Sequence, residues 1–174
     1  KLDVAHEGSK STKIQWLSND GPSGKLLTTG ASKHSGREIK VWDLKNLSKP
    51  LHVEAVDTAS GALMPLYDHD TGVLYLCGKG DGQIRLYEHD ESKAPFIFKL
   101  NDGFRSTSPG KGYCMVPKRG LDIMACETTR LLKLTNTDGI HPLKFTVPRK
   151  SEAFQDDIDR KSTRLNSSHA NISY

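Results

Sequence analysis

The feature that most constrains the fold is a short pattern that occurs twice, in which alternating apolar residues end in an aromatic residue followed by an acid. The first copy is IKVWD at 39–43 and the second is IRLYE at 84–88. An apolar residue at every second position is typical of a β-strand that buries one face. Because the second copy follows the turn-forming sequence GDG at 80–82, a β-hairpin is predicted over 77–88.

Three units of this kind can be aligned along the chain. The second strand of each unit is expected to end at Gly30, Gly78 or Cys126, and these positions are evenly spaced. The fourth strand of each unit is expected to begin at a proline, because an outermost strand loses least from a missing N–H donor. The expected strands, in chain order, are 14–17, 26–30, 39–43, 50–53, 62–67, 74–78, 84–88, 95–98, 113–116, 122–126, 131–134 and 142–145.

Many short strands without a convincing helix predict an all-β fold. Four strands in a repeat of about 40–45 residues are typical of a WD-repeat β-propeller, in which each four-stranded sheet is called a blade. We therefore predict a partial WD-repeat β-propeller over 1–158, with about three four-stranded blades at 6–57, 58–101 and 107–150. Propellers have about 4–8 blades, so the chain is expected to be a fragment of a longer protein.

The last segment, 159–174, is predicted to be a non-native tail. It has neither the apolar alternation of a strand nor the periodicity of a helix, and its sequence resembles the translation of a sequencing adapter. Much of the chain's formal charge of +4 comes from this tail, which holds Arg160, Lys161 and Arg164 against Asp159. The weakly basic remainder does not indicate a nucleic-acid-binding protein.

Composition argues against several other classes of protein. No run approaches the ~18 apolar residues that a membrane-spanning helix needs. The cysteines Cys77, Cys114 and Cys126 are odd in number and form no C-x-x-C pair, which argues against a disulfide framework and against a zinc site. Reduced cysteines in strands are typical of a cytosolic protein.

No pattern in the sequence favours an enzyme. The stretch GKGDG at 78–82 lacks the spacing of a phosphate-binding P-loop, and a strand follows it where a helix is required. The histidines are scattered without an H-x-x-x-H pair, and there is no G-x-S-x-G nucleophile elbow. Asp68 and Asp70 are interpreted as turn formers rather than as part of a carboxylate site. We therefore predict a protein that is not an enzyme and that has no metal or cofactor.

Some polar residues are predicted to stabilise the blades. In a WD repeat a His, a strand Ser or Thr, a turn Asp and a Trp form a buried hydrogen-bonded chain, which avoids unpaired polar groups that each cost ~1–3 kcal/mol. The set is incomplete here, since the first unit has Glu38 near its turn and the second has a tyrosine in place of the tryptophan. The residues assigned to this role are His6, Thr29 (or its neighbour Thr28), Trp42, Asp43, Asp81 and Tyr87.

Several segments of the chain resemble the coronin family in order and spacing. They are DTASG at 57–61, LCGKGD at 76–81, VPKRGL at 116–121 and VPRKSEAFQDD at 147–157. The segment GREIKVWDLK at 36–45 is more similar to the two-propeller subclass of that family. The resemblance extends over 6–158, which is nearly all of the sequence outside the tail.

The resemblance implies a seven-bladed propeller that binds actin filaments and regulates actin dynamics in the cytoplasm, with a Golgi association in the two-propeller subclass. The implied partners are F-actin and other proteins that contact the propeller faces. Neither nucleic acid nor a membrane span is implied. The alternative function is a WD-repeat scaffold for non-actin partners, such as a vesicle-trafficking or ubiquitin-ligase adaptor.

Basic loop residues are the candidates for contact with an acidic partner such as an actin filament. The alternative interpretation is ordinary solvated loop charge. The candidate residues are Arg105, Lys111, Lys118, Arg119, Arg149 and Lys150.

Overall fold

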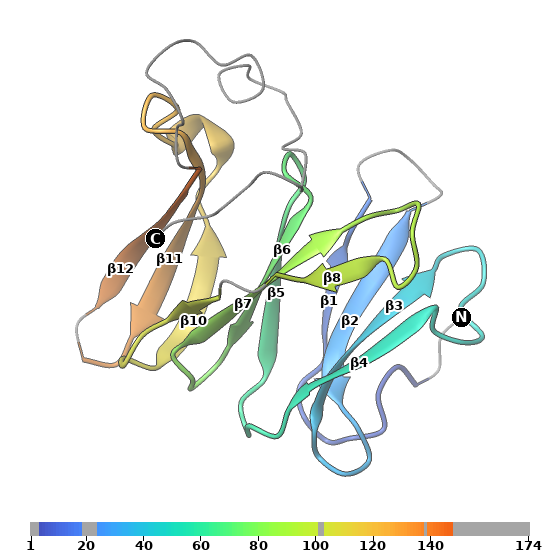
Figure 1. The fold of residues 1–174 in the computed structure, drawn as a ribbon. Helices are drawn as coiled ribbons and strands as arrows, with labels where there is room; N and C mark the ends of the chain where they lie inside the picture. The colour runs from blue at the N-terminus through green and yellow to red at the C-terminus, as the bar shows by residue number, and fades with distance from the viewer. Residues whose placement is uncertain (1–3, 19–23, 101–102, 138, 148–174) are drawn as a thin grey trace.

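The computed structural model describes residues 4–18, 24–100, 103–137 and 139–147. Three antiparallel β-sheets stand side by side in chain order (Figure 1). The first sheet consists of β1 (Lys13–Trp16), β2 (Lys25–Ala31), β3 (Arg37–Asp43) and β4 (His52–Asp57), each paired with the next.

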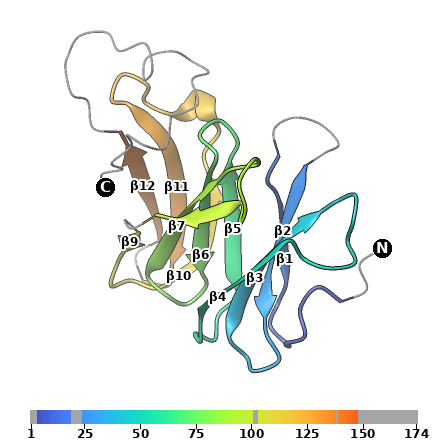
Figure 2. The ribbon, with the colours of Figure 1, turned by 45° about the vertical axis from the view of Figure 1, so that its right-hand side comes forward.

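The second sheet has five strands because two short strands share one edge of β7. Its strands are β5 (Leu63–Asp68), β6 (Val73–Gly78), β7 (Gln83–His89), β8 (Ile97–Lys99) and β9 (Phe104–Arg105). β8 pairs with the last residues of β7, whereas β9 pairs with Gln83 and Ile84 at its start (Figure 2). The strand β9 was not expected from the sequence.

The third sheet has three strands within the described residues. They are β10 (Gly110–Met115), β11 (Glu127–Thr135) and β12 (Ile140–Thr146), in that order across the sheet. The short 3-10 helix η2 (Lys118–Gly120) lies in the connection between β10 and β11. No helix in the described part of the chain is long and apolar enough to cross a membrane.

The all-β prediction of antiparallel blades is confirmed, and all but one of the expected strands overlap an observed strand. The exception is 122–126, which was wrong: these residues form turns, and Cys126 has a φ of 54°. The expected third strand, 131–134, instead belongs to β11, which is the second strand of its sheet. Pro142 therefore lies in the third strand and not at the start of a fourth, because η2 and the turns after it lengthen the first connection.

The core consists of two apolar layers, one on each side of the second sheet. Every residue of β6 is buried, and alternation sends its side chains to opposite faces. Leu74 and Leu76 pack towards the first sheet with Leu27, Ile39 and Val41. The opposite layer, towards the third sheet, comprises Val73, Tyr75, Cys77, Ile84, Leu86, Leu131 and Phe145. Burial of each large side chain contributes ~1.5–3 kcal/mol, so these layers hold neighbouring sheets together.

The connections between strands gather at two opposite ends of the sheets (Figure 1). One end, here called the β6–β7 end, holds the β2–β3, β4–β5, β6–β7 and β11–β12 connections. The other, called the η2 end, holds the β3–β4, β5–β6, β7–β8 and β10–β11 connections. Charged loop residues can contact the same partner surface only where they lie at the same end.

A close approach of two backbones at the β6–β7 end gives a test of this packing. A Cβ added at Gly61 would lie 1.7 Å from the carbonyl oxygen of Lys79, whereas one at Gly36 would meet nothing nearer than 3.5 Å. We expect Gly61→Ala in the full-length protein to lower the free energy of unfolding by about 1–3 kcal/mol, because the two segments must separate.

Gly36→Ala is the matched control, since Gly36 lies in a connection at the same end and its added methyl group would make ordinary contacts. We expect it to change the free energy of unfolding by less than about 1 kcal/mol. Urea unfolding of the two variants measures both values, and equal effects would contradict the observed approach.

Candidate functional site

A chain of buried hydrogen bonds crosses the first sheet. Trp42 Nε1 donates to Thr28 Oγ1 at 2.8 Å, and Thr28 Oγ1 lies 2.8 Å from His6 Nε2. His6 Nδ1 lies 2.9 Å from Glu38 Oε1. Since a carboxylate only accepts, the hydrogen-bond pattern places the proton of the neutral imidazole on Nδ1 and makes Nε2 the acceptor of the Thr28 hydroxyl.

The register of β2 explains why Thr28, of the two threonines considered, lies in this chain. Leu26 pairs with Trp42, so Thr28, two residues further, shares their face of the sheet. Thr29 points to the other face, where its hydroxyl donates to the carbonyl of Leu63 in the second sheet at 3.0 Å. Strand alternation, counted from the residue that pairs with Trp42, thus distinguishes Thr28 from Thr29.

Two other residues differ from the arrangement expected of a WD repeat. Glu38 accepts from Lys40 Nζ at 3.0 Å as well as from His6, so a glutamate supplies the carboxylate of the chain. Asp43 is not part of it: its Oδ1 accepts the backbone N–H of Lys45 at 2.9 Å, in the turn after β3.

Asp81 belongs to a partly buried ionic cluster between the first and second sheets, which we call the arginine–aspartate cluster (Arg37, Asp57, Asp81 and Arg85). Arg37 donates to both oxygens of Asp57, at 2.5 and 2.6 Å, and to Asp81 Oδ2 at 2.8 Å. Arg85 Nη2 donates to Asp57 Oδ2 at 2.5 Å. An arginine from the first sheet thus pairs with the turn aspartate of the second.

The electrostatics of the cluster favour its charged form. Arg37 is only 1% exposed, and burial alone would disfavour the guanidinium, but the hydrogen bonds that it donates to Asp57 and Asp81 outweigh the effect of burial and raise the pKa of Arg37. Burial also disfavours the carboxylate of Asp57, yet its bonds to Arg37 hold its pKa below the ordinary value. A buried ion of this kind is stable only while its partners stay in place.

Tyr87 and Asp68 make further contacts between elements. The Tyr87 hydroxyl donates to Glu54 Oε1 on β4 at 3.0 Å, and so joins the second sheet to the first. Asp68 Oδ2 accepts from Thr129 on β11 at 2.8 Å and from Lys118 Nζ at 2.5 Å, and so joins the second sheet to the third. Each pair of neighbouring sheets is therefore joined by at least one hydrogen bond to a charged side chain.

The six basic candidates do not form one surface. Arg105 and Lys111 are exposed at the β6–β7 end, whereas Lys118 and Arg119 lie on η2 at the opposite end. The ammonium of Lys118 is occupied by Asp68 and by the carbonyl of Thr128. Arg149 and Lys150 lie outside the described residues, as does the 159–174 tail.

Four of the charged residues that connect the sheets were not singled out in the sequence for that role: Arg37, Asp57, Asp68 and Arg85. Asp57 and Arg37 appeared only within family-like segments, and the expected strand began two residues after Arg37. The available signal was weak: an arginine that is buried requires a partner, but Arg37 shares its strand with other charged residues. That signal names no partner, because the acids come from another strand or from a turn of another sheet.

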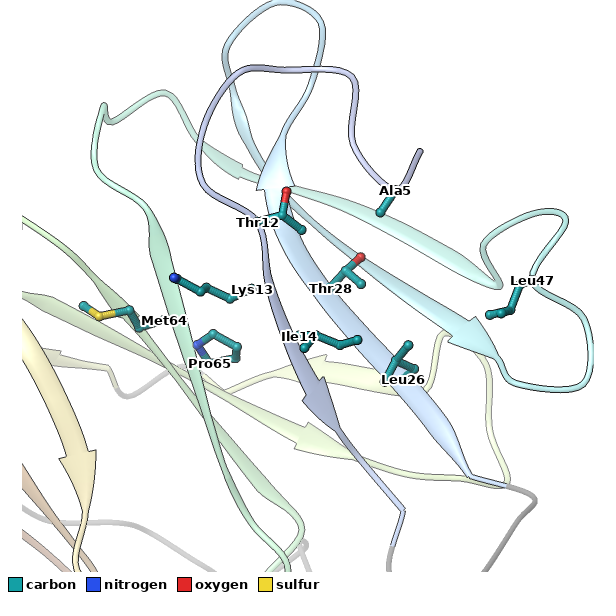
Figure 3. A pocket seen from close by; sticks show the side chains of 9 residues that line it. All are labelled: Ala5, Thr12, Lys13, Ile14, Leu26, Thr28, Leu47, Met64 and Pro65. Atoms are coloured by element: carbon teal, nitrogen blue, oxygen red, sulfur yellow. The ribbon is translucent and has the colours of Figure 1, made fainter. Parts of the chain in front are cut away.

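The described residues include an apolar groove of about 660 Å³ beside β1 (Figure 3). Ile14 and Leu26 line it together with Met64 and Pro65 of β5, and Lys13 alone of its nine lining residues is ionisable. No group of three His, Cys, Asp or Glu side chains that could hold a metal ion occurs in the described ranges. The groove thus presents apolar contact area rather than paired acid and base groups.

The hydrogen-bonded chain of the first sheet predicts unequal effects for its two neighbouring threonines. Thr28→Val leaves both the Trp42 N–H and His6 Nε2 without their buried partner, so we expect it to lower the free energy of unfolding by about 2–4 kcal/mol. Thr29→Val removes a single donor to a backbone carbonyl, and about 1 kcal/mol is expected. Urea unfolding of the two full-length variants measures the difference; a larger effect for Thr29→Val would contradict the assignment.

The same chain predicts how stability depends on pH. Burial lowers the pKa of His6 below 6.5, and Lys40 acts in the same direction, while Glu38 opposes them. The unfolded state therefore binds a proton at a higher pH than the folded state. The free energy of unfolding is expected to fall as the pH decreases from about 6.5 through the lower pKa of the folded protein.

Replacement of this histidine isolates its contribution. We expect His6→Gln to reduce the slope of unfolding free energy against pH between about pH 5 and pH 7, measured by urea unfolding. His34→Gln, at an exposed position of the β2–β3 connection, should keep the wild-type slope. Identical slopes for the wild type and His6→Gln would contradict a buried, neutral His6.

Comparisons with known proteins identify the family. No protein-family model matches the chain. Human Coronin-2A is 43% identical over 157 residues, which are 90% of this chain and 29% of the relative. Coronin-A of Dictyostelium discoideum is 46% identical over 156 residues, which are 89% of this chain and 33% of the relative. The chain thus spans about a third of the length of these curated relatives.

The fold agrees with that relationship. The crystal structure of the WD40 domain from Toxoplasma gondii coronin matches with a TM-score of 0.78 and 34% identity, and covers 94% of this chain and 41% of that one. The three sheets therefore correspond to part of a WD40 propeller. Sequence and fold agree, and the chain belongs to the coronin family.

Proposed function

We propose that the protein containing this chain binds actin filaments and regulates the actin cytoskeleton. The observation that supports this most is its relationship to coronins over nine-tenths of the chain, since that family resemblance implies filament binding. The proposal places the protein in the cytoplasm, on the actin cytoskeleton, and at the Golgi if it belongs to the two-propeller subclass.

The proposed mechanism is non-covalent binding by a rigid scaffold. The buried carboxylates of Glu38 and Asp68 and the partly buried carboxylate of Asp57 each have a cationic partner, so their charges stabilise the sheets. Cys77 is buried, and burial raises the pKa of its thiol, which disfavours the reactive thiolate. These features support a protein that acts through its surfaces and not through a catalytic site.

Loops at the ends of the sheets are the proposed contact elements. A propeller holds such loops on rigid strands, so their side chains meet a partner with little ordering cost. Arg105, Lys111 and Arg119 are exposed basic residues on these loops or next to them. Positive loop charge complements the acidic surface of an actin filament and accelerates encounter with it.

The full-length protein is expected to co-sediment with actin filaments. The fraction in the pellet should be larger at low than at physiological salt, because ions screen exposed charges. Measurement of bound protein against filament concentration at the two salt concentrations tests this, with a centrifuged sample without actin as the control. A protein that stays in the supernatant in both cases would exclude filament binding and favour a scaffold for non-actin partners.

A further inference from the structure

Three segments at the β6–β7 end are joined into one surface, which we call the basic shelf (79–82, 103–106 and 110–111). Gly80 donates its N–H to the carbonyl of Gly110 at 2.8 Å, and Gly110 donates to the carbonyl of Asp81 at 3.0 Å. Ser106 donates to the carbonyl of Gly82 at 2.9 Å. Backbone hydrogen bonds thus fix the relative positions of residues that are distant in the sequence.

The segments of the shelf are also packed against each other. A Cβ at Gly82 would lie 1.8 Å from the carbonyl oxygen of Ser106, so only glycine permits this approach. Phe104 of β9 packs against the apolar layer between the second and third sheets. The shelf is therefore anchored to the core and is not a set of independent loops.

Each segment of the shelf directs one basic side chain outward by a different backbone feature. Lys79 is exposed in the tight β6–β7 turn, where Gly80 has a φ of 81°. Arg105 follows the inward-facing Phe104 and is exposed, as strand alternation requires. Lys111 is the extra residue of a β-bulge, because Gly110 and Gly112 pair with successive residues of β11.

The acids near the shelf are already occupied. Asp81 accepts from Arg37, and Asp57 accepts from Arg37 and Arg85, so the arginine–aspartate cluster has no net charge. Within the described residues, neither Lys79 nor Arg105 nor Lys111 forms a side-chain hydrogen bond or ion pair. Asp102 and Asp138 lie outside the described residues. The exposed charge of the shelf as described is therefore positive and unopposed.

The opposite end has no comparable surface. Exposed acids lie among the exposed bases of this end, with Glu91 beside Lys93 in one connection and Arg119 near Asp122 in another, whereas the β3–β4 connection has only the bases Lys45 and Lys49. Lys118 is paired with Asp68. Acids and bases that lie at the same end partly offset each other, so the field of this end is of mixed sign.

We propose that the basic shelf is a docking surface for an acidic protein surface. Where the partner is the actin filament, this inference rests on the function proposed above and assigns the contact to Lys79, Arg105 and Lys111. Three charges on a rigid backbone suit a patch of carboxylates. Single-stranded nucleic acid would call for exposed aromatic platforms, and Phe104, the aromatic residue of the shelf, packs inward.

The test compares two triple variants of the full-length protein that lose the same charge. The shelf variant is Lys79→Gln with Arg105→Gln and Lys111→Gln. The matched control removes exposed bases of the η2 end, Lys45→Gln with Lys49→Gln and Lys93→Gln. Thermal melts establish that both fold like the wild type, as expected for exposed side chains.

Two binding measurements separate the shelf from the proposed function. In filament co-sedimentation the shelf variant should bind about tenfold more weakly than the wild type, and the control less than about twofold more weakly. On immobilised polyglutamate, which contains no actin, the shelf variant should elute at lower salt than the control. Equal elution of the two variants, or no retention of the wild type, would overturn the docking surface.

The outcomes are distinguishable. Suppose that the wild type does not bind filaments but that, of the two variants, only the shelf variant loses polyglutamate binding. The proposal of filament binding is then wrong, and the shelf is retained as a docking surface for another acidic protein. If the two variants bind filaments equally well, filament binding stands and the assignment to the shelf fails. Shelf-dependent binding to phosphatidylserine vesicles without retention on polyglutamate would assign the surface to a membrane and overturn the proposal.

Discussion

The pairing of Arg37 with Asp57 and Asp81 is the interaction on which the arrangement of the first two sheets most depends. Arg37 starts β3, Asp57 ends β4 and Asp81 lies in the β6–β7 turn, so one guanidinium fixes three segments. Loss of Arg37 would leave two partly buried carboxylates facing Arg85 alone, which is far costlier than loss of an exposed pair. The apolar layers supply most of the favourable free energy, but they tolerate sliding. The directional ionic bonds therefore determine the relative position of the two sheets.

The second and third sheets are also joined by a charged side chain, at the η2 end. Asp68 accepts from Lys118 and Thr129, and so connects the second sheet to the third near η2. The two junctions therefore lie at opposite ends of the second sheet. A sheet held at one end to each neighbour, with apolar layers between, has little freedom to rotate about either contact. Such rigidity suits a scaffold whose loops must keep a fixed relative position.

Much of the fold could be predicted because it depends on local patterns. The alternation at 39–43 and at 84–88 specifies strands whatever they pack against. The third sheet was partly mispredicted because Cys126 matched a repeat interval, while η2 and its turns had displaced the strand. The ionic contacts could not be predicted, since Arg37 and its acids belong to different strands and turns and a charged residue at a strand end resembles an exposed one. Thr28 could have been chosen from the alternation that starts at Trp42.

The basic candidates show why a charge on a loop is not yet a binding residue. In the sequence Lys118 and Lys111 look alike, since both lie in polar stretches between strands. In the structure one ammonium neutralises Asp68, whereas the other projects from a bulge with no described acid beside it. The difference is that the buried carboxylate of Asp68 requires the charge of Lys118, whereas no described carboxylate requires that of Lys111. The pairs that hold the sheets together thus also determine which charges remain for a partner, and Lys79, absent from the sequence-based candidates, becomes one of them.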